Sequence, residues 1–154
     1  MKKIVPSLWF SDKNCEEAIN YYISVFPNSH ILHIERYPEE SLSEHFTGMS
    51  GKIITAEFIL NGLKFIALDG GDYFRFNEAI SMTIECEDQQ EIDYYWEKLS
   101  HVKEAEQCGW VKDKFGLSWQ IVPYNMGELM KTDAQVKAMM NMKKIIIKEL
   151  ESAV

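Results

Sequence analysis

The sequence predicts an α+β fold made of two tandem βαβββ modules followed by a C-terminal helical tail. In each half, an apolar strand-like run is followed by a helix-capping residue and an amphipathic helix. The two helices share a short motif, Ile19-Asn20-Tyr21-Tyr22 in the first and Ile92-Asp93-Tyr94-Tyr95 in the second. This repeat favours duplication of one unit. We therefore expect a single domain, 1–154, with module 1 at about 3–70, module 2 at about 78–123 and the tail at about 128–152.

Module 1 begins with an expected strand over residues 4–10. Asn14 and Glu17 have the spacing of a capping box, and the helix that they start is expected to end at Pro27. A second strand is expected over 30–37, followed by a polar loop over 38–51. Asn61-Gly62 then predicts a hairpin between strands 53–60 and 63–68, because this dipeptide suits a two-residue turn.

Module 2 is expected to begin with a strand over 79–86, and Asp88 with Glu91 predicts the cap of its helix. Two further strands are expected over 105–112 and 117–122, joined by a tight turn at 113–117 in which Gly116 supplies a positive φ. The tail over 128–150 is predicted to be helical with a break near 141–144. Its methionines indicate packing against a core or a subunit interface.

Composition narrows the class of protein. The net charge of −8 argues against binding nucleic acid, which needs a concentrated basic face. The N-terminal apolar run is too short for a signal peptide or a membrane span, so we expect a cytoplasmic protein that does not bind membranes. Three widely spaced cysteines without a CxxC motif favour reduced thiols over disulfides or zinc.

A family resemblance is found in residues 108–123, CGWVKDKFGLSWQIVP. An Asp-x-x-Gly turn followed by a strand with a polar residue four positions after the glycine resembles the last strand of the vicinal oxygen chelate superfamily. That superfamily includes glyoxalases, bleomycin-resistance proteins and extradiol dioxygenases. The full string, together with MKKI at 142–145, is similar to its PhnB-like branch, also called 3-demethylubiquinone-9 3-methyltransferase-like. The resemblance implies two curved half-sheets with the site on their concave face, a homodimer and, in many members, a divalent metal.

The metal ligands that the resemblance implies fall near Val5, Ala67, Ser81 and Gln120. Of these residues, only Gln120 could coordinate an ion, so we predict that the usual metal site is absent and that no cofactor is bound. By strand alternation, a displaced polar site is expected on the concave face. Its members would be Trp9, Glu57, Phe65, Asp69, Thr83 and Gln120. The alternative is that Glu57 lies at the solvent-exposed entrance of the cavity and that Asp69 only begins a turn.

The histidines are weaker candidates. His30 and His33 are three residues apart on one strand, so we expect them to point to opposite faces. His101 follows a helix end, where a histidine suits the helix dipole. His45 is retained as a candidate, since it lies in the long loop before the third strand, and loops over a cavity often carry function.

The leading functional hypothesis is a small-molecule-binding protein, or an enzyme of unassigned reaction, with an aromatic-lined, metal-free cavity. Plain core packing of these aromatic rings is the alternative. A metal-dependent lyase, isomerase or dioxygenase of the glyoxalase type is the second hypothesis, and sequestration of a cationic antibiotic is the third. No glycine-rich turn of an S-adenosylmethionine site is present, so methyl transfer is not expected. The predicted ligand-binding residues are Trp9, His45, Glu57, Phe65, Asp69, Ser81 and Gln120.

Overall fold

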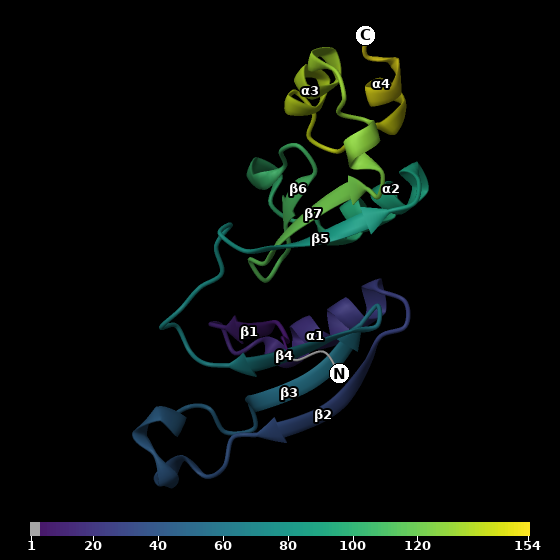
Figure 1. Cartoon of the computed structure of the whole chain (residues 1–154). Helices are drawn as coiled ribbons and strands as arrows, with labels where there is room; N and C mark the ends of the chain where they lie inside the picture. Colours follow the sequence, from purple (N-terminus) through teal and green to yellow (C-terminus); the bar gives the residue numbers. More distant parts are fainter. Residues whose placement is uncertain (1–3) are drawn as a thin grey trace. The chain divides into compact units, whose positions relative to one another are not determined.

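The computed structural model describes residues 4–154 and has an α+β fold. The chain forms two compact units, Met1–Phe76 and Asn77–Val154, which are described separately (Figure 1). In each unit a helix packs on a mixed parallel and antiparallel sheet. Among the described residues, every helix is too short or too polar to cross a membrane.

The sheet of the first unit has four strands in the order β1-β4-β3-β2. The strands are β1 (Ser7–Phe10), β2 (His30–Arg36), β3 (Ile53–Leu60) and β4 (Leu63–Asp69). β1 pairs in parallel with β4, and the other pairs are antiparallel. The predicted hairpin is confirmed: Asn61 and Gly62 both have positive φ, as a two-residue turn requires.

Helix α1 (Cys15–Val25) covers one face of this sheet and buries Ala18, Ile19 and Tyr22. The loop after β2 contains two short 3₁₀ helices, η1 (Glu40–Leu42) and η2 (Glu44–Phe46), and extends beyond the sheet (Figure 1). Because no helix formed by residues 4–76 lies on the face of the sheet opposite α1, we call it the open face of the first unit.

The second unit contains β5 (Ser81–Cys86), α2 (Gln89–Leu99), η3 (Lys103–Ala105), β6 (Trp110–Lys112) and β7 (Ser118–Pro123). Its sheet has the order β5-β7-β6, with β5 parallel and β6 antiparallel to β7, so it has one strand fewer than the first. The predicted cap is confirmed, because Asp88 Oδ1 accepts a hydrogen bond from Glu91 N at 2.9 Å. The face opposite α2 is the open face of the second unit.

The strand expected over 105–112 was predicted too long, because β6 begins at Trp110. Cys108 and Gly109 have φ of 49° and 87°, which a strand cannot accommodate. Glycine is required at position 109 for a second reason: an added Cβ would lie 2.9 Å from the Ile121 carbonyl oxygen. The local backbone therefore turns where the sequence pattern suggests a continuous strand.

The tail consists of η4 (Met126–Glu128), α3 (Asp133–Met140) and α4 (Ile147–Ser152). The predicted break near 141–144 is confirmed, since α3 ends at Met140 and α4 begins at Ile147. The segment in the break is hydrogen-bonded to the residues just before β6, since Cys108 N donates to the Met142 carbonyl and Gly109 N to the Lys143 carbonyl, both at 2.8 Å. Leu129, Met142, Ile145 and Leu150 form a buried cluster, so the tail has a core of its own.

Candidate functional site

The open face of the second unit has a hydrogen-bonded polar pair at its centre. β7 lies between β5 and β6, and the neighbours of Gln120 across the sheet are Thr83 and Trp110. Gln120 Nε2 donates to Ser81 Oγ at 2.9 Å. The side chains of Ser81, Trp110 and Gln120 are half-buried, and Thr83 is exposed. This face therefore presents an amide, a hydroxyl and an indole ring close together, and two of these residues are predicted site residues.

The turn before β7 sets the orientation of this strand. Asp113 is buried, and its Oδ1 accepts hydrogen bonds from Phe115 N at 2.8 Å and Leu117 N at 3.1 Å. Asp113 Oδ2 accepts from Trp119 Nε1 at 2.8 Å. Since successive residues of a strand alternate between faces, holding Trp119 toward the helix directs Gln120 to the open face. The sequence predicts this turn but not the bond from Asp113 to Trp119.

Trp9 and Glu57 lie on the open face of the first unit. Trp9 Nε1 donates to the Gly71 carbonyl at 2.8 Å, and the Trp9 ring makes an edge contact with Phe74. Gly70 has to be glycine here, because an added Cβ would lie 2.1 Å from the Trp9 ring. Glu57 forms an ion pair with Lys64 at 3.0 Å. Both predicted residues therefore have partners within the unit.

The expectation that Phe65 and Asp69 share this open face is wrong. Across the two-residue hairpin turn, Glu57 pairs with Ile66 and Phe58 pairs with Phe65. Odd-numbered residues of β3 therefore face the same side as even-numbered residues of β4. The two side chains are buried on the helix-covered face instead, where the Phe65 ring stacks on the ring of Phe58.

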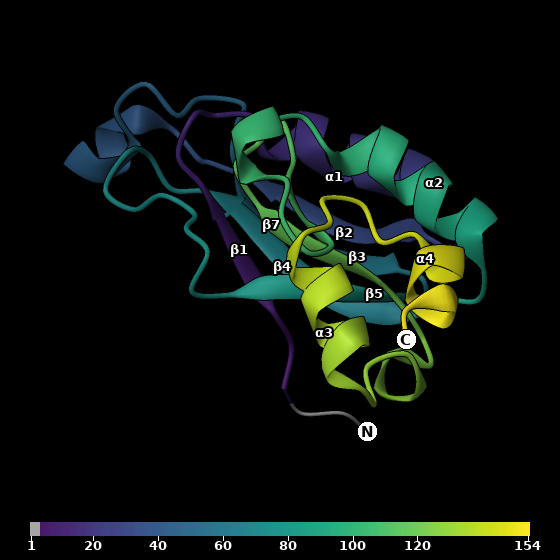
Figure 2. The ribbon, with the colours of Figure 1, turned by 90° about the horizontal axis from the view of Figure 1, so that it is seen from above.

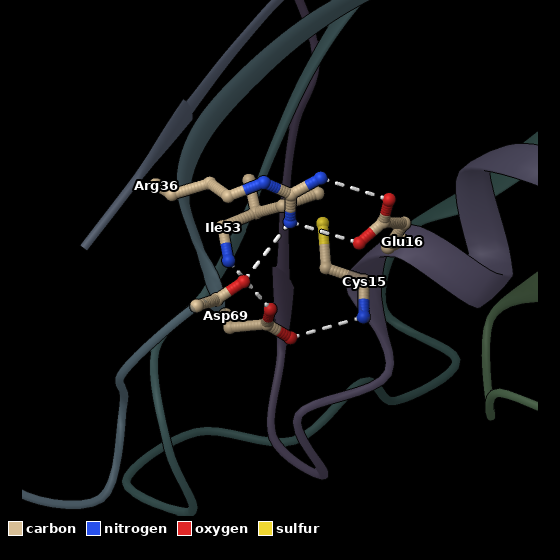
Figure 3. A network of polar contacts seen from close by, with 6 residues as sticks. Cys15, Glu16, Arg36, Ile53 and Asp69 are labelled. Carbon is tan, nitrogen blue, oxygen red and sulfur yellow. Dashed lines mark hydrogen bonds and ion pairs between the residues drawn. The ribbon is translucent and has the colours of Figure 1, made fainter.

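Asp69 has a structural role at the start of α1. Its Oδ1 accepts from Cys15 N at 2.9 Å and its Oδ2 from Ile53 N at 3.1 Å (Figure 3). Asn14 occupies the N-cap position but makes no side-chain capping bond, so the predicted capping box with Glu17 is wrong. A carboxylate from the end of β4 satisfies the first amide of the helix in its place. Burial, with Asp69 nearby, raises the pKa of the Cys15 thiol and makes it unreactive.

An ion pair continues this network toward the loop after β2. The Arg36 guanidinium donates to both carboxylate oxygens of Glu16 at 2.9 Å (Figure 3). It also donates to the Gly51 carbonyl at 2.9 Å. The hydrogen bond from Arg36 lowers the pKa of Glu16. Arg36 and Ile53 stand at the two ends of the loop, so the network fixes its base.

His45 lies in η2 of this loop and lines a hollow of about 570 Å³. The lining residues are Ser11, Asp12, Lys13, Glu44, His45, Thr47, Met49, Gly70, Gly71, Asp72, Tyr73 and Arg75. Lys13 and Arg75 are matched there by Asp12, Glu44 and Asp72, so the hollow has no strong preference for either sign of charge. The structure places His45 over a cavity of the first unit, whereas Ser81 and Gln120 belong to the second unit.

The expectation that His30 and His33 face opposite sides is also wrong. The pairing of β2 with β3 shifts by one residue at Leu32, so His30 pairs with Ile59 and His33 with Glu57. Ile59 and Glu57 share a face, and a β-bulge therefore brings both histidines to it. Even so, no three His, Cys, Asp or Glu side chains within residues 4–154 come together as a metal site would require.

The donor chemistry does not fit the metal that the superfamily implies. Ala67 has no donor atom in its side chain. Ser81 and Gln120 offer only a hydroxyl and an amide, and these two groups bond to each other. A shift of one residue in either direction does not supply an imidazole, carboxylate or thiolate. The residues then reached are Ile4, Pro6, Ile66, Leu68, Ile80, Met82, Trp119 and Ile121. All three cysteines are free, and burial raises the pKa of Cys86 to about 12.

Comparisons with known proteins agree with this fold. Residues 2–122 match the family profile of 3-demethylubiquinone-9 3-methyltransferase. A solved structure from Bacillus cereus, described as a PhnB protein of that type, is 35% identical, with 79% of this chain and 99% of that chain covered and a TM-score of 0.64. No curated protein sequence matches the chain.

Two more distant structures show the fold alone. A protein of Pseudomonas aeruginosa is 18% identical, with 80% of this chain and 98% of that chain covered and a TM-score of 0.58. The fosfomycin resistance protein FosX of Listeria monocytogenes is 17% identical, with 85% of this chain and 98% of that chain covered and a TM-score of 0.50. The fold is therefore that of the vicinal oxygen chelate superfamily.

Proposed function

The chain belongs to the PhnB-like family described as 3-demethylubiquinone-9 3-methyltransferase, and we propose that it binds a small organic molecule without a divalent metal. The hydrogen bond between Gln120 Nε2 and Ser81 Oγ, on the open face of the second unit, carries this proposal. The resemblance to the superfamily implies metal ligands near these two positions. Bonded to each other, they suit a polar organic group better than a cation.

The chemistry of this face supports an organic ligand. No donor among the described residues reaches Gln120 Oε1, and the Ser81 hydroxyl can still donate its proton. The half-buried Trp110 ring is the cross-strand neighbour of Gln120 and offers an apolar contact. One acceptor, one donor and one ring are what small-molecule sites combine. A ligand with a carbonyl or hydroxyl group next to a planar apolar body would use all three.

We do not extend the methyl transfer in the family's description to this chain. Methyltransferases of the common type hold S-adenosylmethionine at a glycine-rich turn between a strand and a helix. Here β1 is followed by Ser-Asp-Lys-Asn, and β5 by Glu87 and Asp88, before the helices begin. Neither junction contains a glycine that would let the backbone approach a cofactor.

The test is a ligand-observed NMR screen of small aromatic amides, ketones and alcohols against the wild type and the Gln120→Ala, Trp110→Ala and Gln90→Ala variants. We expect hits that lose their saturation-transfer signal in the first two variants and keep it in Gln90→Ala, since Gln90 is exposed on α2. Melting temperatures close to the wild-type value would show that the variants fold. Hits that bind all variants equally would contradict the proposed site.

We also propose that the chain forms a homodimer. β2 is an edge strand of the first sheet, and its Ile31 and Leu32 are 37% and 48% exposed. Unpaired strand edges favour association with a partner. Light scattering after gel filtration is expected to give twice the chain mass of 17.9 kDa, and a value equal to the chain mass would contradict the proposal.

A further inference from the structure

The second unit contains a hollow of about 520 Å³ on the side of its C-terminal tail. It lies between the first turn of α2, the segment that follows β7, and α4, which stands beside the start of α2 (Figure 2). The lining residues are Glu87, Asp88, Gln89, Tyr124, Asn125, Ile146, Ile147, Lys148 and Glu151. Ser81, Trp110 and Gln120 are not among them, so this is a different site from the one proposed above.

The walls of this hollow are fixed by hydrogen bonds. Gln89 Nε2 donates to the Ile145 carbonyl at 3.0 Å, while Gln89 Oε1 accepts from Ile147 N at 2.9 Å. A single side chain thereby joins the start of α2 to the backbone on both sides of Ile146. On the opposite wall, Tyr124 N donates to the Cys86 carbonyl at 2.9 Å. These hydrogen bonds fix the backbone of both walls, so the shape of the hollow does not depend on mobile side chains alone.

The floor and one wall are apolar. Ile146 and Ile147 are partly buried and pack against the cluster of Leu129, Met142, Ile145 and Leu150. Tyr124 is 58% exposed, which leaves its ring accessible to a ligand. The volume falls within the range of small-molecule sites. A ligand with an apolar body can therefore bury surface here.

The charge of the lining is negative. Glu87, Asp88 and Glu151 carry carboxylates, against one lysine, Lys148, among the described lining residues. Asp88 uses one oxygen to cap α2, but neither Glu87 nor Glu151 has an ion-pair partner in the part of the chain that the structure describes. The raised pKa of Cys86, which comes from burial first and then from Glu91 and Asp88, is consistent with a negative potential at this end of α2.

We infer that this hollow binds a small organic cation, an amine or quaternary ammonium group attached to an apolar body. The carboxylates of Glu87 and Glu151 would hold the charge, and the exposed Tyr124 ring would add a cation–π contact. An anion is disfavoured, because Asp88 and Glu91 already compensate the positive end of the α2 dipole. A neutral ligand would leave the carboxylates of Glu87 and Glu151 without a positively charged partner.

The test is an NMR titration of the ¹⁵N-labelled full chain with benzyltrimethylammonium chloride. Benzyl alcohol is the uncharged control and phenylacetate the anionic control. We expect the cation to shift the amide signals of Tyr124, Ile146 and Ile147, and its affinity to fall as salt is raised. The two controls are expected to bind more weakly. Shifts that map instead to β5, β6 and β7 would overturn the inference and leave the proposed function untouched.

Variants test the role of charge. Glu87→Gln combined with Glu151→Gln is expected to weaken binding of the cation about five-fold, the size typical of two exposed charge contacts. Glu149→Gln is the matched control, since Glu149 is exposed on α4 but does not line the hollow. Tyr124→Leu is expected to weaken binding by about three-fold. Equal affinity in the double variant and the wild type, or equal affinity for benzyl alcohol and the cation, would overturn the inference.

Discussion

Within residues 4–154, each unit buries one aspartate, and the two aspartates act over different distances along the chain. Asp113 accepts hydrogen bonds from residues 2, 4 and 6 positions later, all within one turn and the strand after it. Asp69 accepts from Cys15 and Ile53, which are 54 and 16 positions away. Asp113 therefore shapes a local turn, whereas Asp69 joins a helix start, a strand start and a strand end. The difference shows that a buried carboxylate can be a local or a global structural element, depending on which amides it satisfies.

The largest expected effect is that of Asp69→Ala. It would leave the amides of Cys15 and Ile53 buried without acceptors, at about 1–3 kcal/mol each. Urea unfolding is expected to show a loss of about 3 kcal/mol or more in the free energy of unfolding. Asp72→Ala is the control, because Asp72 is exposed nearby and should change stability by less than about 0.5 kcal/mol. A loss below about 1 kcal/mol for Asp69→Ala would contradict the global role.

A smaller loss is expected for Asp113→Ala. The amides of Phe115 and Leu117 lie in a turn, where water can replace part of the lost bonding, so we expect about 1–2 kcal/mol. The indole of Trp119 loses its acceptor as well, and its fluorescence emission should change in the folded state. If Asp113→Ala proved more destabilising than Asp69→Ala, the contrast between local and global roles would be wrong.

Ser118 extends the comparison to a buried polar group that is not satisfied. It is 1% exposed, and its Oγ has no hydrogen-bond partner among the described residues. Ser118→Ala is therefore expected to raise the free energy of unfolding by about 1 kcal/mol, the opposite sign to the two aspartate variants. Thermal melting measures this directly. A clear loss of stability would show that the hydroxyl is bonded in solution.

The smallest expected effect concerns pH and the Glu16–Arg36 pair beside Asp69. The pKa of Glu16 is lowered in the folded chain, so this pair stabilises the protein above the ordinary glutamate pKa of 4.5 and loses that contribution as pH falls through the lower folded value. Glu16→Gln is expected to make stability less dependent on pH below 4.5. An unchanged pH profile of the melting temperature would contradict a lowered pKa.

Sequence reasoning succeeded where the structural cause is local. Asn61-Gly62, the cap formed by Asp88 with Glu91, and the turn that contains Asp113 each act within a few residues, and all three are observed. Sequence reasoning failed where contacts between residues far apart in the chain determine the local structure. Asn14 has the right residue type for a cap, yet Asp69 from a distant strand takes that role.

The candidate site on the second unit was predicted only in part, because its geometry also depends on contacts between distant residues. Ser81 and Gln120 were identified, but their hydrogen bond depends on the register of β5 with β7. Phe65 was assigned to the wrong face, because a two-residue turn changes which residues of a hairpin share a side. The hollow beside α4 could not have been predicted, since it exists only after the tail packs beside the start of α2 within the second unit.

The most direct test of metal-free binding is elemental analysis of untagged protein purified without chelator, combined with melting in added nickel, zinc, manganese and iron. Because Gln120 offers a single amide oxygen and Ala67 has no donor atom, we predict no stoichiometric metal and no change in melting temperature. Near-stoichiometric metal, with a raised melting temperature that Gln120→Ala abolishes, would contradict the proposed function.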